Sequence, residues 1–163
     1  MDANTRRVVG FVTAQLVFIA ALIHLGLGLF QWLEKLVLAG WLVPRDARWP
    51  VFTLSGLAVL VGMYAAARAE NRRPYYVAGI VVMLGYVVGY FGWHLGGHRL
   101  LLIVGASTGS ESISVGWFLD HLFAGPVEFL AIITETLAAL GLAVLFVTGD
   151  DTPAVDGTEA GGE

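Results

Sequence analysis

The chain has 163 residues, which is enough for one domain. Hydrophobic residues make up 57% of it and charged residues only 13%, whereas an ordinary soluble domain carries about 25% charged residues. This composition leaves too little polar surface to cover a water-facing globule, and it argues against a soluble enzyme. The chain contains no cysteine, which excludes disulfides, thiolate metal sites, iron–sulfur clusters and a cysteine nucleophile.

The net charge of −4 is a property of the end of the chain. Residues 150–163 are rich in Gly, Thr, Ala and acidic side chains and contain no aromatic residue. We predict that they form a disordered, solvated tail, and that residues 1–149 form a single transmembrane domain. Because the remaining charges are nearly balanced and form no basic stripe, we expect no nucleic-acid partner.

Four apolar runs follow one another along the chain, at about residues 8–33, 51–67, 75–95 and 126–147. Each is close to the roughly 20 residues that a helix needs to cross the hydrocarbon of a bilayer. The runs lack the alternation of barrel strands, so helices are the structure in which their backbone groups can be satisfied within lipid. The sequence therefore predicts an all-α integral membrane four-helix bundle with the lipid bilayer as its principal partner.

The connections on the side of the bundle away from the termini are long and only partly polar. Residues 36–43 and 115–123 each have the pattern of a short helix lying on the membrane surface, and residues 99–104 have that of a re-entrant or interfacial piece. We predict that these segments cap the outer side of the bundle.

Basic residues indicate the orientation. Arg6 and Arg7 precede the first run, and the short turn between the second and third runs contains Arg68, Arg72 and Arg73. The basic residues of the other side, among them Lys35 and Arg99, are spread over two long connections. The higher density near the termini predicts a multi-pass protein of the cell membrane with both termini in the cytoplasm.

All four histidines fall in the outer half of the predicted bundle. His94 and His98 end the third run with i, i+4 spacing, which places them on one face if the helix continues that far. His121 lies just before the fourth run, and His24 lies about 9 to 13 Å below the outer end of the first helix.

The fourth run adds two carboxylates at different depths. Glu128 is expected near the outer boundary and Glu135 near the middle of the bilayer; with His121 they form one stripe if the helix runs unbroken through Pro126. A charged, unpaired carboxylate at that depth costs several kcal/mol. We therefore expect Glu135 to face the bundle and to be protonated or partnered, with His24 as the partner at comparable depth.

One hypothesis is a metal or redox site, because neutral imidazoles and carboxylates suit Zn, Cu or Fe. His94 and His98 would be the first ligands, His121 and His24 further candidates, and Glu128 a carboxylate ligand or proton acceptor. Haem is less favoured, because ligation by two histidines needs them at similar depth and His24 lies deeper than His94.

Three alternatives stand beside the metal hypothesis. The bundle could move protons or a small solute through Glu135 and His24, or these two residues could form a purely structural interhelical hydrogen bond. The small size and the glycine-rich helix faces also suit an accessory subunit of a membrane complex, bound to another membrane subunit or to further copies of itself.

Three stretches resemble those of known membrane proteins. These are HLGLGLFQWLEKL at the end of the first run, the basic turn RAENRRP and the acidic tail GDDTPAVDGTEAGGE. With the four-run layout, they resemble small four-helix membrane proteins of the DoxX-like type and uncharacterised membrane proteins of haloarchaea. The resemblance implies an association with respiratory redox systems, and it assigns no catalytic residue.

Overall fold

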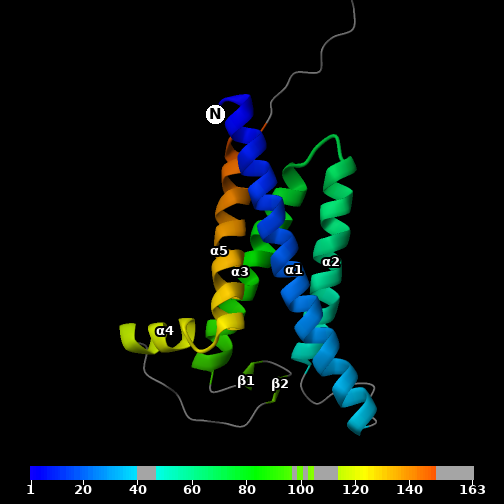
Figure 1. Ribbon diagram of the computed structural model, residues 1–163, viewed down its shortest axis with the longest axis vertical. Coiled ribbons are helices and arrows are strands. Elements are labelled where there is room, and N and C mark those ends of the chain that lie inside the picture. Colours follow the sequence, from blue (N-terminus) through cyan, green and yellow to red (C-terminus); the bar gives the residue numbers. More distant parts are fainter. Residues whose placement is uncertain (40–46, 97–98, 101–102, 105–113, 150–163) are drawn as a thin grey trace, which may run out of the picture.

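The computed structural model describes residues 1–39, 47–96, 99–100, 103–104 and 114–149 (Figure 1). The helices within these ranges are α1 (Ala3–Ala39), α2 (Arg48–Arg68), α3 (Arg73–Leu95), α4 (Val115–Leu122) and α5 (Pro126–Val147). Two short antiparallel strands, β1 (Arg99–Leu100) and β2 (Ile103–Val104), pair with each other between α3 and α4. The helices α1, α2, α3 and α5 are each long and apolar enough to cross a membrane, which confirms the predicted all-helical four-span fold.

The four long helices run alternately up and down (Figure 1). The N-terminus, the turn between α2 and α3 and the end of α5 lie at one end of the bundle, while α4 lies across the opposite end. The helix α1 is central, because it packs along both α2 and α5, and α5 packs in turn against α3. In contrast, α2 and α3 barely touch each other although only residues 69–72 separate them.

Local sequence explains where the helices begin. At the start of α1, the Asp2 carboxylate accepts hydrogen bonds from the backbone N–H groups of Asn4 and Thr5 and from the Thr5 hydroxyl. The Thr5 hydrogen bonds hold the pKa of the Asp2 carboxyl below its usual value. The Ser114 side chain caps α4 by accepting from the Trp117 N–H at 3.0 Å, which is the usual role of serine at this position. Pro126 opens α5 at a position where its missing N–H costs nothing.

Some boundaries differ from those predicted. The helix α1 has 37 residues, begins at Ala3 and continues to Ala39, so residues 36–39 extend it instead of starting a surface helix. In the segment predicted as a re-entrant or interfacial piece, Arg99–Leu100 pairs with Ile103–Val104 as the strands β1 and β2. The surface helix predicted for residues 115–123 is present as α4. The expected acidic tail at 150–163 and residues 40–43 lie outside the described residues.

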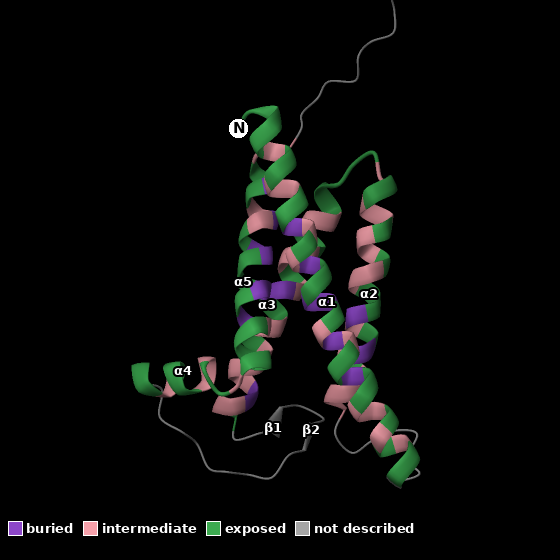
Figure 2. Cartoon of the chain, viewed as in Figure 1, coloured by how far each residue is buried: buried purple, intermediate pink, exposed green. Residues whose placement is uncertain are grey.

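Buried residues lie where the long helices face one another and exposed residues cover their outer faces (Figure 2). The core lies where α1, α3 and α5 meet and contains Val17, Ala20, Met83, Ala138, Ala139 and Leu142. Large side chains such as Phe11, Phe30, Val61 and Val88 are exposed on the outer faces. A soluble protein would expose such a surface to water at great cost, whereas in a bilayer it contacts lipid.

Glycines set the close approach of α1 and α2. A Cβ atom added to Gly56 would lie 2.8 Å from both the Ala21 carbonyl oxygen and the Leu25 backbone nitrogen. A Cβ atom at Gly28 would meet the Thr53 and Trp49 backbone in the same way. Because backbone atoms cannot swing aside as side chains do, these two positions accept only glycine unless the helices separate.

We expect Gly56→Leu to destabilise the bundle by about 1 to 3 kcal/mol, the usual cost of overpacking. Gly62→Ala is the matched control on the same helix, because a Cβ atom there meets nothing within 4 Å. Thermal unfolding in detergent, followed by circular dichroism, measures both. Equal melting temperatures for the two variants would contradict the close approach of α1 and α2.

Candidate functional site

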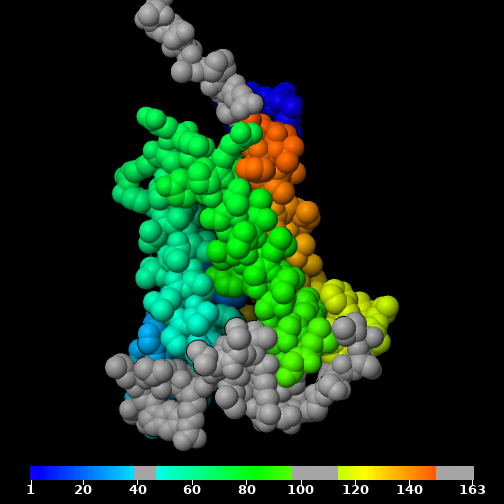
Figure 3. All heavy atoms as spheres, turned by 180° about the vertical axis from the view of Figure 1, so that it is seen from behind, coloured from blue at the N-terminus to red at the C-terminus, as the bar shows by residue number. Residues whose placement is uncertain are grey.

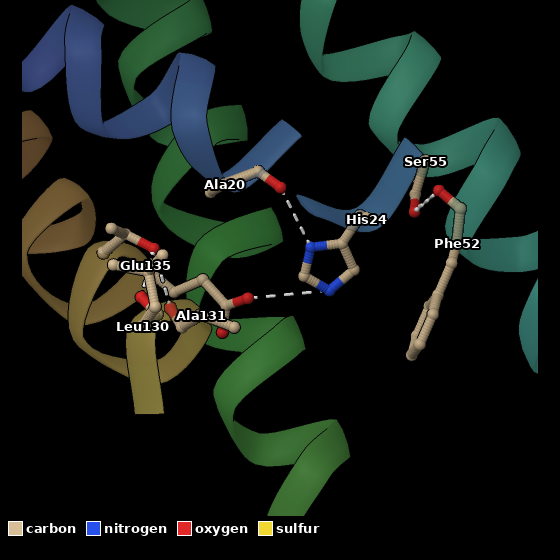
Figure 4. Close-up of polar contacts among 8 residues, drawn as sticks. Ala20, His24, Phe52, Ser55, Leu130, Ala131 and Glu135 are labelled. Carbon is tan, nitrogen blue, oxygen red and sulfur yellow. Dashed lines mark hydrogen bonds and ion pairs between the residues drawn. The ribbon is translucent and has the colours of Figure 1, made fainter. Parts of the chain in front are cut away.

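His24 is the residue at which all four membrane-spanning helices meet. It projects from α1 and is only 6% exposed. Its ring stacks on that of Tyr86 from α3, with centroids 3.6 Å apart, and meets the edge of Phe52 from α2 at 4.9 Å. On the fourth side, its Nε2 lies 3.5 Å from Oε1 of Glu135 on α5, which is 2% exposed (Figure 4). The pairing of His24 with Glu135 that depth predicted is therefore present in the structure.

The hydrogen bonds of His24 determine where its hydrogen sits. Nδ1 lies 3.1 Å from the Ala20 carbonyl oxygen, and since a carbonyl can only accept, Nδ1 carries a hydrogen and donates it. In the neutral ring Nε2 is then an acceptor, which faces the carboxyl of Glu135. Such a pair is held together by one proton, carried either by Glu135 as a carboxylic acid or by His24 as an imidazolium.

The 3.5 Å separation is at the upper end of the hydrogen-bonding range, so the proton is not tightly shared. The neighbouring Thr134 hydroxyl does not compete for Glu135, because it donates to the carbonyls of Leu130 at 2.7 Å and Ala131 at 2.9 Å. In the low dielectric of the bundle, the neutral arrangement with a protonated Glu135 costs less than two buried charges.

A third polar group, the phenol of Tyr86, completes this cluster. Among the described residues, no group forms a hydrogen bond of good geometry with its buried hydroxyl. The hydroxyl of Ser55 lies nearby and interacts with it. Ser55 donates its own hydrogen to the Phe52 carbonyl at 3.1 Å, and its oxygen keeps lone pairs that face the phenol. His24, Glu135 and Tyr86 are hereafter called the central cluster.

A second cluster, formed by Tyr90, His94 and His121 and hereafter called the outer cluster, lies between α3 and α4 at the end of the bundle opposite the N-terminus. The rings of His94 and His121 meet edge to face with centroids 4.6 Å apart. The Tyr90 hydroxyl donates to the His121 carbonyl at 2.8 Å and ties the two helices together. Phe91 on α3 adds a stacking contact with Phe118 on α4. This outer cluster explains why the short helix α4 is held against the end of α3.

The outer cluster contains part of the predicted metal site. In both His94 and His121, Nδ1 faces a backbone carbonyl, at 2.9 Å from Tyr90 and 2.8 Å from Trp117 respectively. Each ring thus keeps its lone pair on Nε2, the form in which histidine binds metals.

The other predicted ligands are not placed beside this pair. His24 belongs to the central cluster, and His98 lies outside the described residues because α3 ends at Leu95. Glu128 is exposed in the first turn of α5, close enough to act electrostatically on the Tyr90 hydroxyl. Within the described residues, no three histidine or acidic side chains form a group that could hold a metal ion.

The predicted stripe of His121, Glu128 and Glu135 is interrupted, because α4 ends at Leu122 and α5 begins at Pro126. The haem hypothesis is not favoured by the positions of the histidines. His24 and His94 lie in separate clusters, and His94 and His121 touch each other too closely for an iron with ligands on opposite sides.

Two tyrosines organise these clusters, Tyr86 and Tyr90, and neither was among the site residues predicted from the sequence. Tyr86 and Tyr90 are spaced i, i+4 on α3 and project toward the bundle, with His94 one turn further along the same face. The run Tyr86, Tyr90, His94 was a usable signal, because polar aromatic residues repeated at helical spacing within a membrane span favour an inward face.

No known protein family, curated protein or solved structure matches the chain. The resemblance to DoxX-like proteins therefore stays a prediction.

We expect infrared difference spectra to show the carbonyl stretch of a protonated carboxyl group at neutral pH, because the central cluster favours a neutral Glu135. Glu135→Gln should remove this band. The matched control Glu128→Gln, two turns away on the same helix and exposed, should keep it. A band that persists in Glu135→Gln would show that the acid lies elsewhere.

Proposed function

We propose that the protein binds and hands on protons inside the membrane, at the central cluster, as part of proton or proton-coupled small-solute movement through the bundle. The observation that supports this proposal is the buried pair of His24 and Glu135, which face each other at 3.5 Å and whose surroundings include all four spanning helices. Ionisable residues inside membrane spans are costly, and they commonly mark ion pathways and proton relays.

The geometry suits transfer of a proton between the two residues. Hydrogen bonding to the Ala20 carbonyl fixes the ring of His24, so that Nε2 points at Glu135 (Figure 4). Proton exchange then needs only a small closing movement of the Glu135 side chain. A purely structural hydrogen bond would favour a shorter contact than 3.5 Å.

Glu128 offers a route toward the outer surface. It lies two helical turns from Glu135 along α5, about 10 Å along the axis, and its side chain is exposed. A proton released from the central cluster would therefore have an acceptor between the pair and the outer surface, with water bridging the distance. On the opposite side, the Thr13 hydroxyl is buried between α1 and α5, beside Gly141.

We expect Glu135→Gln to lower proton flux through protein-containing vesicles by roughly tenfold or more, a loss typical for removal of a proton-transfer group. A potassium diffusion potential drives the flux, and an entrapped pH-sensitive dye reports it. Glu70→Gln is the charge-matched control, because Glu70 is exposed in the α2–α3 turn. Equal proton flux in the wild type, Glu135→Gln and Glu70→Gln would exclude the proton role.

The outer cluster supports a second candidate function, a transition-metal or redox site. The supporting observation is the contact between the rings of His94 and His121, both with Nδ1 tied to a carbonyl. Copper or zinc bound there would need at least one further donor, for which His98 and Glu128 are the candidates. When bound, the metal would supply Lewis-acid or one-electron chemistry at the outer membrane surface.

We expect the double variant His94→Ala/His121→Ala to lose the metal that the purified protein retains, since removal of two ligands abolishes a site of this size. Elemental analysis and the absorption spectrum of the detergent-purified protein measure the metal. His24→Ala is the control, because His24 lies in the other cluster. Negligible metal in all samples would end the metal hypothesis.

We also propose that both termini lie in the cytoplasm, because five arginines lie at the same end of the bundle as the N-terminus: Arg6, Arg7, Arg68, Arg72 and Arg73. The cysteine-free chain allows a direct measurement. In intact cells, a membrane-impermeant maleimide should label Ser114→Cys and spare Asn71→Cys. The reverse pattern would invert the topology.

A further inference from the structure

Arginines gather at the end of the bundle that carries the N-terminus. They come from the first turns of α1, the last residue of α2 and the residues that start α3: Arg6, Arg7, Arg68, Arg72 and Arg73. Figure 3 shows this end from behind, with the α2–α3 turn in green at the top, near the start of α1 in blue and the end of α5 in orange. Among the described residues at this end, the acidic side chains are Asp2 and Glu70, and the Asp2 carboxylate already accepts three hydrogen bonds. The described part of this end is therefore positively charged.

Arg68 lies on the lipid-facing side of α2. Exposed apolar and aromatic residues of this helix follow one another at intervals of three or four, which places them on one face: Leu54, Leu57, Val61 and Tyr64. Arg68 comes four residues after Tyr64 and continues the same stripe. Its guanidinium lies over the Tyr64 ring, with Cζ 3.8 Å from the ring centroid. The charge is therefore on the outer wall of the bundle, where the apolar stripe ends and the lipid headgroups begin.

Two neighbouring helices place arginines in the same way. On α3, the exposed Arg73 precedes the exposed Val77 by four residues, and its Cζ lies 5.6 Å from the centroid of the Phe146 ring on α5. On α1, the exposed Arg7 precedes the exposed Phe11 by four residues. The lipid-facing sides of α1, α2 and α3 thus all carry a guanidinium at the same end of the bundle.

We propose that this end of the bundle binds the headgroup of an anionic phospholipid, with Arg68 and Arg72 as the principal contacts. Guanidinium groups bind phosphate oxygens through paired hydrogen bonds, and basic residues beside a membrane span attract anionic lipids. A zwitterionic headgroup brings a cation together with its phosphate, whereas an anionic headgroup leaves a negative charge that balances the arginines. In the proposed topology this is the cytoplasmic leaflet, to which anionic lipids give a negative surface potential. Headgroup binding does not depend on the proton role proposed above.

The position of Arg68 favours a lipid over a soluble partner or the acidic end of the chain. A soluble acidic macromolecule would reach the α2–α3 turn from water, and it would not approach the side wall of α2, where the Arg68 guanidinium covers Tyr64. Five acidic residues follow α5 at positions 150–163, but α1 lies between α5 and α2. Headgroups surround α2 directly, so they meet Arg68 on the face that it occupies.

Lipid retention by the full chain tests the proposal. The protein is placed in nanodiscs of equal parts phosphatidylglycerol and phosphatidylcholine with matched acyl chains. Native mass spectrometry then counts the lipids that stay bound after release from the nanodisc. We expect phosphatidylglycerol to exceed phosphatidylcholine roughly tenfold among the retained lipids, because more than one arginine contributes.

Single-charge variants locate the binding. Arg68→Gln should lower the phosphatidylglycerol excess about fivefold, the effect of one basic residue beside an anionic surface. Lys35→Gln is the matched control, because it removes one exposed positive charge near the opposite end of α1, and it should change the excess less than about twofold. Should Arg68→Gln fail to fold, Arg72→Gln in the exposed turn carries the same expectation.

Three results would overturn the proposal. The first is equal retention of the two lipids by the wild type, which is also the outcome if the acidic residues of positions 150–163 occupy the arginines. The second is an equal effect of Arg68→Gln and Lys35→Gln, which would mean that the preference follows overall charge. The third is loss of the excess when inorganic phosphate is added at constant ionic strength, because the arginines would then bind the free anion.

Discussion

The contact between His24 and Glu135 is the constraint on which the arrangement of the helices depends. A carboxyl and an imidazole within the hydrocarbon zone must find each other or another polar partner. Here the partnership links α1 to α5, and the ring of His24 then contacts Tyr86 of α3 and Phe52 of α2. Around this point, small residues such as Ala20 and Ala138 allow the backbones to approach. The polar pair thus fixes which faces of the four helices point inward. Apolar side chains specify these faces poorly, because they are about as stable against lipid as against another helix.

The two polar clusters lie at different positions along the helices and carry different chemical groups. In the central cluster, His24 and Glu135 are buried and the contacts of His24 connect all four spans. The outer cluster, built from Tyr90, His94 and His121, lies where α3 meets the surface helix α4. The first cluster is the site of the proposed proton exchange, whereas the second brings two imidazole rings into contact. The i, i+4 spacing of Tyr86, Tyr90 and His94 along α3 joins the two clusters on one helix face.

Much of the fold could be predicted from the sequence, because the transfer of an apolar run into lipid depends mainly on its own composition. The spans and the surface helix α4 followed from hydropathy, and the pairing of His24 with Glu135 followed from depth alone. The residues that surround the pair could not be predicted, since they depend on how each helix is rotated about its axis. Phe52 and Tyr86 look like many other aromatic residues in the spans until α2 and α3 are placed.

The predicted metal ligands were harder to place. They come from different helices, and the sequence does not specify the paths of the loops that connect these helices. Imidazoles in the same half of the bundle can belong to different clusters, as His24 and His94 do. The break between α4 and α5 at residues 123–125 also turns His121 away from the stripe that Glu128 and Glu135 would have shared with it. Conversely, the separation of α2 from α3 has no sequence signal, since glycine-rich faces usually indicate close packing.

The unequal lengths of the spans have a consequence for the setting in which the protein works. With 37 residues, α1 is about 55 Å long, whereas α2, with 21, is about 31 Å and matches a hydrocarbon layer of about 30 Å. Accordingly α1 leans across the bundle and protrudes past its neighbours (Figure 1). Its tilt must therefore follow membrane thickness. Because His24 is carried on α1 and Glu135 on α5, a thicker or thinner bilayer would shift one against the other, so lipid composition itself would tune the distance over which the proton is shared.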